Sequence, residues 1–189
     1  MPLWAGIGSR TLNKNELNFC WWTGWLMAKC GWDLVTGAAT GADQKFAEGA
    51  IAGGGKVYLE IPWYSYEEKW VNWARSKGAI INVLAKEGHK DALAAYQSVK
   101  MFHPKADNLS SGAFKLHARN FNIVLGPRGK RHVNLVVAWP KSNKWGNLGG
   151  TGQGLKIAAR YRIKVENLEL SETRKRITRK MKAVHETQH

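Results

Sequence analysis

Short apolar runs alternate along the chain with stretches in which apolar side chains recur every three to four positions. The apolar runs predict β-strands at residues 3–8, 33–36, 56–61, 133–139 and 163–167. The three-to-four spacing predicts helices at residues 13–29, 42–51, 66–77, 91–102, 111–125 and 151–161. A further apolar run at residues 79–85 fits either a strand or a loop.

The predicted elements alternate between strand and helix, apart from a long helical stretch before the strand at 133–139. Because such alternation is typical of an α/β fold, we expect a Rossmann-like parallel sheet with helices on both faces and a helical insert before the late strand. A chain of 189 residues has the size of one domain. We assign residues 1–170 to that domain and residues 171–189 to a basic C-terminal helix or tail.

Three glycine-containing turns stand between predicted strands and helices. They are residues 6–10 (GIGSR), 36–43 (TGAATGAD) and 149–154 (GGTGQG). In a parallel sheet the carboxyl ends of the strands share one rim with the amino ends of the following helices, where unpaired backbone N–H groups can hold an anion. The three turns therefore predict one composite phosphate-binding pocket.

The polar residues of the first two turns have both a binding and a structural interpretation. Gly8 lets the backbone approach a ligand, while Ser9 and Arg10 can bind a phosphate. The same residues also fit a plain strand-to-helix turn with a capping serine. Asp43 can accept a hydrogen bond from a ribose hydroxyl, or it can satisfy N–H groups in the first turn of its own helix.

The chain is strongly basic. Its 29 Lys and Arg residues outnumber 14 Asp and Glu residues, which gives a net charge of +15. Such a balance favours polyanions or phosphorylated small molecules as partners. Residues 171–189 carry six basic and two acidic side chains. This tail is either a solvated helix or frayed terminus, or a non-specific contact for RNA or DNA.

Several common kinds of site lack their sequence motif. There is no GxxxxGK[ST] segment, and no GxGxxG follows the first strand, which argues against a Walker nucleotidase and an ordinary dinucleotide dehydrogenase. Without HExxH, CxxC or GxSxG motifs, we predict no metal site and no cofactor. We expect Cys20 and Cys30 to be buried, reduced thiols. Because no apolar run could span a bilayer and no secretory signal is present, we expect a cytoplasmic protein without membrane contact.

The turns and their surroundings resemble a known group of proteins. The GSR turn after the first strand, and TGAATGAD with Ala47 and Glu48 on the next helix, are similar to the DprA/YspA branch of the SLOG superfamily. Gly150-Thr151, with Leu155 and Ala158 before the last strand, resembles the GTxxxIxxA element of that group. Residues 103–126, which include His103-Pro104 and LHARN at 116–120, resemble bacteriophage members of DprA-like type. The resemblance covers residues 3–168.

The resemblance implies a Rossmann-like domain whose glycine turns bind a nucleotide or a nucleotide-derived ligand. LOG-type enzymes of the superfamily carry a glutamate in a PGGxGTxxE motif, and Lys156 stands at that position here. Cleavage of an N-glycosidic bond is therefore in doubt, and we assign no catalytic residue. The implied ligand-binding residues are Gly8, Ser9, Arg10, Gly37, Ala38, Thr40, Gly41, Asp43, Arg119, Asn120, Gly149, Gly150 and Thr151.

We therefore expect a nucleotide-binding protein of phage type, a homodimer that sequesters a host nucleotide signal in the host cytoplasm. Two alternatives remain open. One is a DprA-like protein that binds single-stranded DNA. The other is a LOG-type nucleoside-phosphate N-glycosidase (phosphoribohydrolase), or another nucleotide hydrolase. The sequence does not identify the nucleotide.

Overall fold

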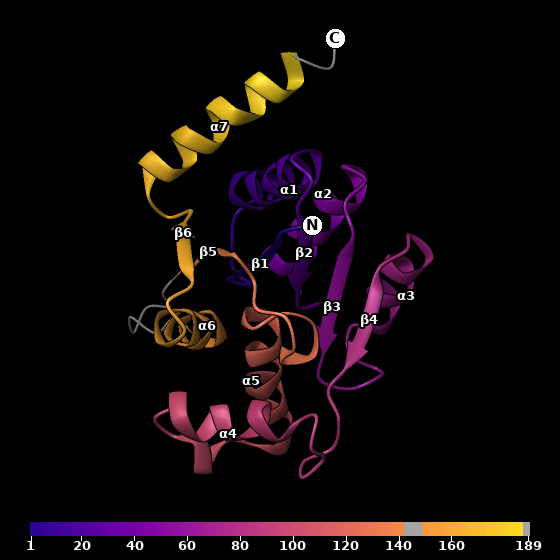
Figure 1. Ribbon diagram of the computed structural model, residues 1–189, viewed down its shortest axis with the longest axis vertical. Helices are drawn as coiled ribbons and strands as arrows, with labels where there is room; N and C mark the ends of the chain where they lie inside the picture. The colour runs from indigo at the N-terminus through magenta and orange to yellow at the C-terminus, as the bar shows by residue number, and fades with distance from the viewer. Residues whose placement is uncertain (142–148, 187–189) are drawn as a thin grey trace.

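The computed structural model describes residues 1–141 and 149–186. Six parallel strands form one sheet in the order β4-β3-β2-β1-β5-β6 (Figure 1). The strands are β1 (Leu3–Gly8), β2 (Asp33–Thr36), β3 (Val57–Ile61), β4 (Ile80–Val83), β5 (Leu135–Trp139) and β6 (Lys164–Asn167). The chain builds the sheet outward from β1 to β4, and then returns to the other side of β1 with β5. Strand order therefore reverses between β1 and β5, the position at which open α/β sheets commonly bind ligands.

Helices cover both faces of the sheet. The helices are α1 (Lys14–Lys29), α2 (Ala42–Ala52), α3 (Glu68–Ser76), α4 (Leu93–Phe102), α5 (Ser111–Val124), α6 (Gly149–Arg160) and α7 (Ser171–Glu186), with short 3-10 turns η1 (Ala106–Asn108) and η2 (Pro127–Gly129). Helix α1 begins with a capping box, because Asn13 and Glu16 accept hydrogen bonds from each other's backbone N–H. Helix α7 crosses the end of the molecule that carries α1 (Figure 1).

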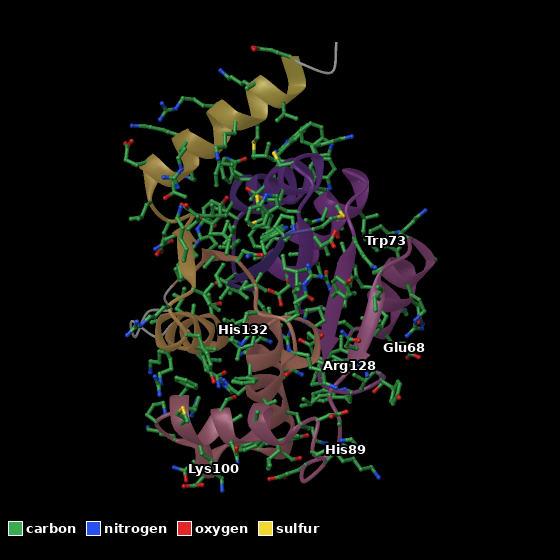
Figure 2. The ribbon with its side chains drawn as sticks, viewed as in Figure 1. Glu68, Trp73, His89, Lys100, Arg128 and His132 are labelled. Atoms are coloured by element: carbon green, nitrogen blue, oxygen red, sulfur yellow. The ribbon has the colours of Figure 1, made fainter. Side chains whose placement is uncertain are left out.

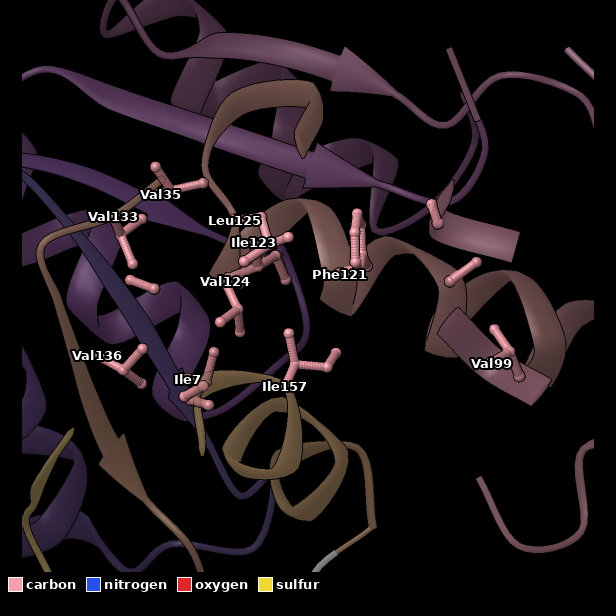
Figure 3. Close-up of a cluster of buried hydrophobic side chains, with 14 of the residues drawn as sticks. Ile7, Val35, Val99, Phe121, Ile123, Val124, Leu125, Val133, Val136 and Ile157 are labelled. Atoms are coloured by element: carbon pink, nitrogen blue, oxygen red, sulfur yellow. The ribbon is translucent and has the colours of Figure 1, made fainter. Parts of the chain in front are cut away.

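Two hydrophobic cores lie on opposite faces of the sheet. One joins the strands to α1, α2, α3 and α7, and its largest fully buried side chains include Trp4 and Phe46. The other joins them to α4, α5 and α6, where Ile7 and Val136 of the sheet meet Ile123 and Ile157 of the helices (Figure 3). This second core fixes α5 and α6 beside β1 and β5, where the strand order reverses.

The expected fold class is confirmed: the sheet is parallel throughout, helices lie on both faces, and α4 and α5 form the helical insert before β5. The run at 79–85 contains a strand, β4, which is an edge of the sheet. The expectation of two buried cysteines was wrong for one of them. Cys20 is buried, but Cys30 is exposed because it caps the carboxyl end of α1. No helix within the described residues is long and apolar enough to cross a membrane.

Candidate functional site

A cavity of about 400 Å³ opens at the carboxyl ends of β1 and β5. The turn after β1 forms one wall, one face of α5 forms another, and the first turns of α2 and α6 complete it. The cavity thus lies where the strand order reverses. Its described lining contains three permanent cations, Arg10, Arg119 and Lys141, but one carboxylate, Asp43.

Arg119 and Asp43 form a buried pair at the edge of the cavity. Each residue is 5% exposed, and Nη1 of Arg119 lies 3.6 Å from Oδ2 of Asp43. Burial raises the pKa of Asp43 to about 6, although Arg119 and backbone hydrogen bonds from Ala39 and Gly8 act in the opposite direction. The carboxylate therefore neutralises Arg119 at neutral pH, but only through one end of the guanidinium.

Not every N–H group of the Arg119 guanidinium has a hydrogen-bond partner within the described residues. Its Nη1 also donates to the backbone oxygen of Glu60 at 3.5 Å, a long hydrogen bond, and its guanidinium lies 5.6 Å from the centre of the Tyr66 ring. Its Nε is buried and has no hydrogen-bond partner within the described residues. A buried N–H without a partner costs about 1–3 kcal/mol. Arg119 therefore lines the cavity while its buried Nε lacks an acceptor within the described residues.

Gly37 makes room for this pair. A β-carbon at position 37 would overlap Nη1 of Arg119 and Oδ2 of Asp43. Gly41, at the start of α2, has φ of 109°, and a β-carbon there would lie 2.8 Å from the backbone of Ser9 and Arg10. The first and second glycine turns are therefore packed directly against each other, which fixes the floor of the cavity.

The first turn presents its polar groups at the mouth of the cavity. The hydroxyl of Ser9 accepts a hydrogen bond from the backbone N–H of Thr11 and lies 2.9 Å from the Thr11 hydroxyl. Arg10 is exposed. Lys141, which follows β5, pairs with Glu16 of α1 at 3.0 Å. Of the three cations, Arg119 is thus the buried one, and the other two lie nearer to solvent.

The third turn begins α6, and α5 supports it through amide side chains. Nδ2 of Asn120 donates to the carbonyl of Gly150 at 3.3 Å and to Oε1 of Gln153 at 3.0 Å. Gln153 also lies 2.7 Å from Nδ1 of His117. Burial lowers the pKa of His117, which keeps the imidazole neutral at pH 7. The first N–H groups of a helix have no partner within the helix, and the first three residues of α6, Gly149, Gly150 and Thr151, line this cavity.

The structure brings most of the predicted ligand-binding residues to one place. Residues from all three turns and from α5 line the cavity: Gly8, Ser9, Arg10, Asp43, Arg119, Asn120, Gly149, Gly150 and Thr151. The other four predicted residues, Gly37, Ala38, Thr40 and Gly41, do not line it. Gly37 and Gly41 instead leave room for the close packing of the residues around the cavity. Thr40 is exposed and donates to Glu67 at 3.3 Å.

Ten further lining residues were not among those assigned to ligand binding, although three of them lie within the glycine turns: Ile7, Thr11, Ala39, Tyr66, Ala113, Leu116, His117, Ile123, Lys141 and Gly154. Those on α5 recur at three- and four-residue spacing with Asn120, so helical periodicity would have found them once Asn120 was chosen. Tyr66 and Lys141 come from loops after β3 and β5, and nothing local marks them. Only the strand order brings these loops to β1.

The structure does not place Lys156 at the cavity, although the sequence comparison put it where LOG-type enzymes carry a glutamate. Lys156 is exposed and does not line the cavity. Gly154 takes the lining position one turn after Gly150, and a β-carbon there would meet Ile7 at 2.8 Å. The residues of α6 that line the cavity therefore include no acidic side chain, and this does not depend on Lys156.

Comparisons with known proteins support the fold. No protein-family model matches the sequence, and no curated protein matches it significantly. DNA processing protein A (DprA) from Streptococcus pneumoniae has a similar structure, with a TM-score of 0.58 at 16% identity over 94% of this chain. This chain spans 56% of that protein. The Moco carrier protein from Chlamydomonas reinhardtii gives a TM-score of 0.51 at 18% identity, over 88% of this chain and 75% of the carrier.

At these identities the likeness concerns the fold alone. Both neighbours share the Rossmann-like α/β fold of this chain. A protein named as a cofactor carrier and one named for DNA processing share the arrangement, so the fold by itself does not identify a function.

Proposed function

We propose that this protein binds a phosphorylated, nucleotide-type ligand in the cavity between β1 and β5. The observation that carries the proposal is Arg119, a buried guanidinium that lines the cavity and whose Nε has no partner within the described residues. Phosphate oxygens are strong acceptors for such a group, and charge-assisted hydrogen bonds of this kind are about twice as strong as neutral ones.

The surroundings of Arg119 favour an anion with an organic part. The amino end of α6 adds backbone N–H groups and the positive end of a helix dipole. Ile7, Leu116 and Ile123 give the same cavity an apolar surface, and Tyr66 adds an aromatic ring. An inorganic anion would leave these side chains without a partner. A nucleotide would place its phosphate at Arg119 and its sugar or base against the apolar side.

Binding is favoured over cleavage. Hydrolysis of an N-glycosidic bond needs a general acid or base in the site. Asp43 is the one carboxylate in the described lining, and it is already paired with Arg119. Nδ1 of His117 lies 2.7 Å from Oε1 of Gln153, so this ring nitrogen is also already paired. We therefore propose a binder, and keep the phosphoribohydrolase as the alternative that a turnover assay would reveal.

Calorimetric titration with cyclic mononucleotides, nucleoside monophosphates and ADP-ribose-type compounds tests the proposal. We expect at least one of them to bind once per chain with micromolar affinity or better. Chromatography of the same mixtures reports cleavage, because release of a free base would identify an enzyme. If no compound bound at micromolar concentration, the proposal would be wrong.

A second candidate is a protein that binds single-stranded nucleic acid. The observation in its favour is α7, whose basic side chains Arg179, Lys180 and Lys182 are exposed and have no ion pair within the described residues. DprA, one of the proteins of similar fold, is named for DNA processing. Affinity in this case would rise with oligonucleotide length and fall steeply with salt.

The biological setting is also proposed on the basis of the resemblance in the glycine turns. We infer a phage-type SLOG protein that acts as a homodimer in the host cytoplasm and withdraws a nucleotide signal from the host. Light scattering after size-exclusion chromatography tests the dimer directly. A monomeric mass at micromolar concentration would remove that part of the proposal and leave the binding site unaffected.

A further inference from the structure

A buried carboxylate lies behind the cavity wall, at the carboxyl end of β3. Glu60 is 1% exposed, and its Oε1 accepts hydrogen bonds from Nδ2 of Asn82 at 2.6 Å and from the backbone N–H of Arg128 at 3.1 Å. The Asn122 side chain is a third hydrogen-bond partner. The carboxylate therefore joins β3 to β4, to α5 and to η2.

This cluster is attached to Arg119 in two ways. The backbone oxygen of Glu60 accepts the hydrogen bond from Nη1 of Arg119. Asn122, which contacts the Glu60 side chain, lies on α5 one turn after Arg119. Glu60 itself does not line the cavity. It therefore contacts the part of α5 that determines where the guanidinium points, without being available to a ligand.

The backbone at Arg128 shows how closely the cluster is fitted. Arg128 has φ of 57°, a left-handed conformation that a residue with a β-carbon rarely adopts. In this conformation its N–H reaches Glu60, while its Nε donates to Oδ1 of Asn82 at 3.3 Å. Figure 2 shows Arg128 near the ends of β3 and β4. The backbone of Arg128 thus contacts the Glu60 carboxylate, and its side chain contacts Asn82, a partner of that carboxylate.

We propose that Glu60 is a positioning residue for Arg119, and that its protonation state controls how firmly the guanidinium is held in the cavity. This inference rests on the proposed function, in which Arg119 binds the ligand's phosphate. It adds to that function a pH-sensitive element outside the binding site, built from residues of four separate elements.

The direction of the effect follows from the partners of the carboxylate. Ionised Glu60 accepts hydrogen bonds from Asn82, Asn122 and Arg128 together. Protonation turns one of its acceptor oxygens into a donor, so the contact between β3 and α5 loosens. Burial raises the pKa of Glu60 to about 7, against the effect of these hydrogen bonds. The charged group that faces the carboxylate is Arg128 from η2, while β4 and α5 contribute the neutral amides of Asn82 and Asn122. Arg119 contacts the backbone oxygen of Glu60 instead.

The proposal can be tested without any ligand. The ¹⁵N resonance of Arg119 Nε, followed between about pH 5 and pH 9, covers the titration of Asp43 and Glu60. In the unmodified protein we expect a step near pH 7 from Glu60, besides a step near pH 6 from Asp43. Glu60→Gln should lack the upper step and keep the lower one. Asp33→Asn, which changes another buried carboxylate in the strand β2, is the control and should keep both.

Affinity for a cyclic mononucleotide gives the second readout, because its phosphodiester does not titrate in this range. Below pH 6 the unmodified protein and Glu60→Gln should bind equally well, since Glu60 is then uncharged in both. At pH 8 the Glu60→Gln protein should bind about fivefold more weakly, the low end of usual couplings between sites. An upper step that persists in Glu60→Gln, or equal affinities at pH 8, would overturn the proposal. If no variant bound any nucleotide but the upper step depended on Glu60, the coupling would stand and the proposed function would fail.

Discussion

Arg119 is buried to a degree that arginine seldom reaches without full compensation. Asp43 balances its charge, but its contact of 3.6 Å is to Nη1, and the buried Nε has no hydrogen-bond partner within the described residues. The pKa of about 6 at Asp43 also means that this carboxylate can lose its charge under mild conditions. Both properties fit a cation that is partly reserved for an external anion.

Replacing Arg119 with Met should weaken nucleotide binding. Hydrogen bonds to a charged group contribute about 1.5–3 kcal/mol, so the loss should be at least tenfold. Asp43 can accept a proton once its partner is gone, which limits the damage to the fold. Calorimetry checks the affinity, and Arg75→Met on the exposed face of α3 is the matched control. Equal affinities in the two variants would remove Arg119 from the site.

Acidification should strengthen binding of a cyclic mononucleotide through Asp43. As the pH falls through about 6, Asp43 is protonated and no longer neutralises Arg119, so the cavity gains a positive charge. At pH 7.5 the Asp43→Asn protein should bind more tightly than the unmodified protein, and it should lack the step near pH 6. A step near pH 6 that survived in Asp43→Asn would have to come from another group.

Glu60 should make the fold less stable as the pH rises. Its pKa is raised from 4.5 to about 7 in the folded protein, so the folded state holds more protons than the unfolded state between these values. The free energy of unfolding therefore falls as the pH rises from about 4.5 to about 7, and this loss is complete above pH 7. Urea unfolding at pH 5 and pH 8 should show a smaller decrease for Glu60→Gln than for the unmodified protein. Identical decreases would contradict the burial of an ionisable group there.

At the scale of elements, the three glycine turns differ in what they do. The first and third place backbone and side chains on the cavity, whereas the second supplies Asp43 and Ala39 and otherwise acts by close packing. The difference could not be predicted from the sequence, because TGAATGAD has the composition of a phosphate-binding loop. It depends on Arg119, which approaches from α5 across the space that Gly37 leaves empty.

Gly37→Ala should therefore disturb the site, although Gly37 does not line the cavity. The added methyl group would overlap Arg119 and Asp43, and overpacking of this kind costs about 1–3 kcal/mol. Both the free energy of unfolding and the nucleotide affinity should fall. Gly112→Ala on α5 is the control, since its nearest neighbour would be Trp63 at 3.8 Å and alanine favours a helix. If Gly37→Ala behaved like the control, the described position of Arg119 would be wrong.

Helix α7 allows the two candidate functions to be separated. Changing Arg179, Lys180 and Lys182 together to Gln removes three exposed cations and leaves Ile177 packed in the core. If the helix binds single-stranded nucleic acid, the slope of log affinity against log salt should become shallower by about 2. Affinity for a mononucleotide should not change, because none of the three residues lines the cavity. An unchanged salt slope would exclude α7 from nucleic-acid binding.

For the whole molecule, the alternation of strands and helices was enough to predict a parallel α/β fold. The apolar pattern placed five strands, and left β4 undecided because its short apolar run fits a strand or a loop. The cavity was predicted in outline from the turns. The Arg119–Asp43 pair, the contact of Tyr66 and the cluster around Glu60 were not, since they join residues far apart in the sequence through strand order and helix packing.

The net charge of +15 belongs to the whole chain and does not by itself identify a partner. In the cavity, positive charge is carried by the buried guanidinium of Arg119 beside the amino end of α6. On α7, positive charge is spread over exposed side chains. We therefore attribute ligand binding to the first arrangement and any nucleic-acid contact to the second.

Native mass spectrometry after incubation with a mixture of nucleotides tests the central claim most directly. The unmodified protein should carry one phosphorus-containing small molecule per chain, whose mass identifies the ligand class. The Arg119→Met protein should carry none, while Arg75→Met should match the unmodified protein. An unmodified protein without such a molecule, or equal occupancy in Arg119→Met, would contradict the account.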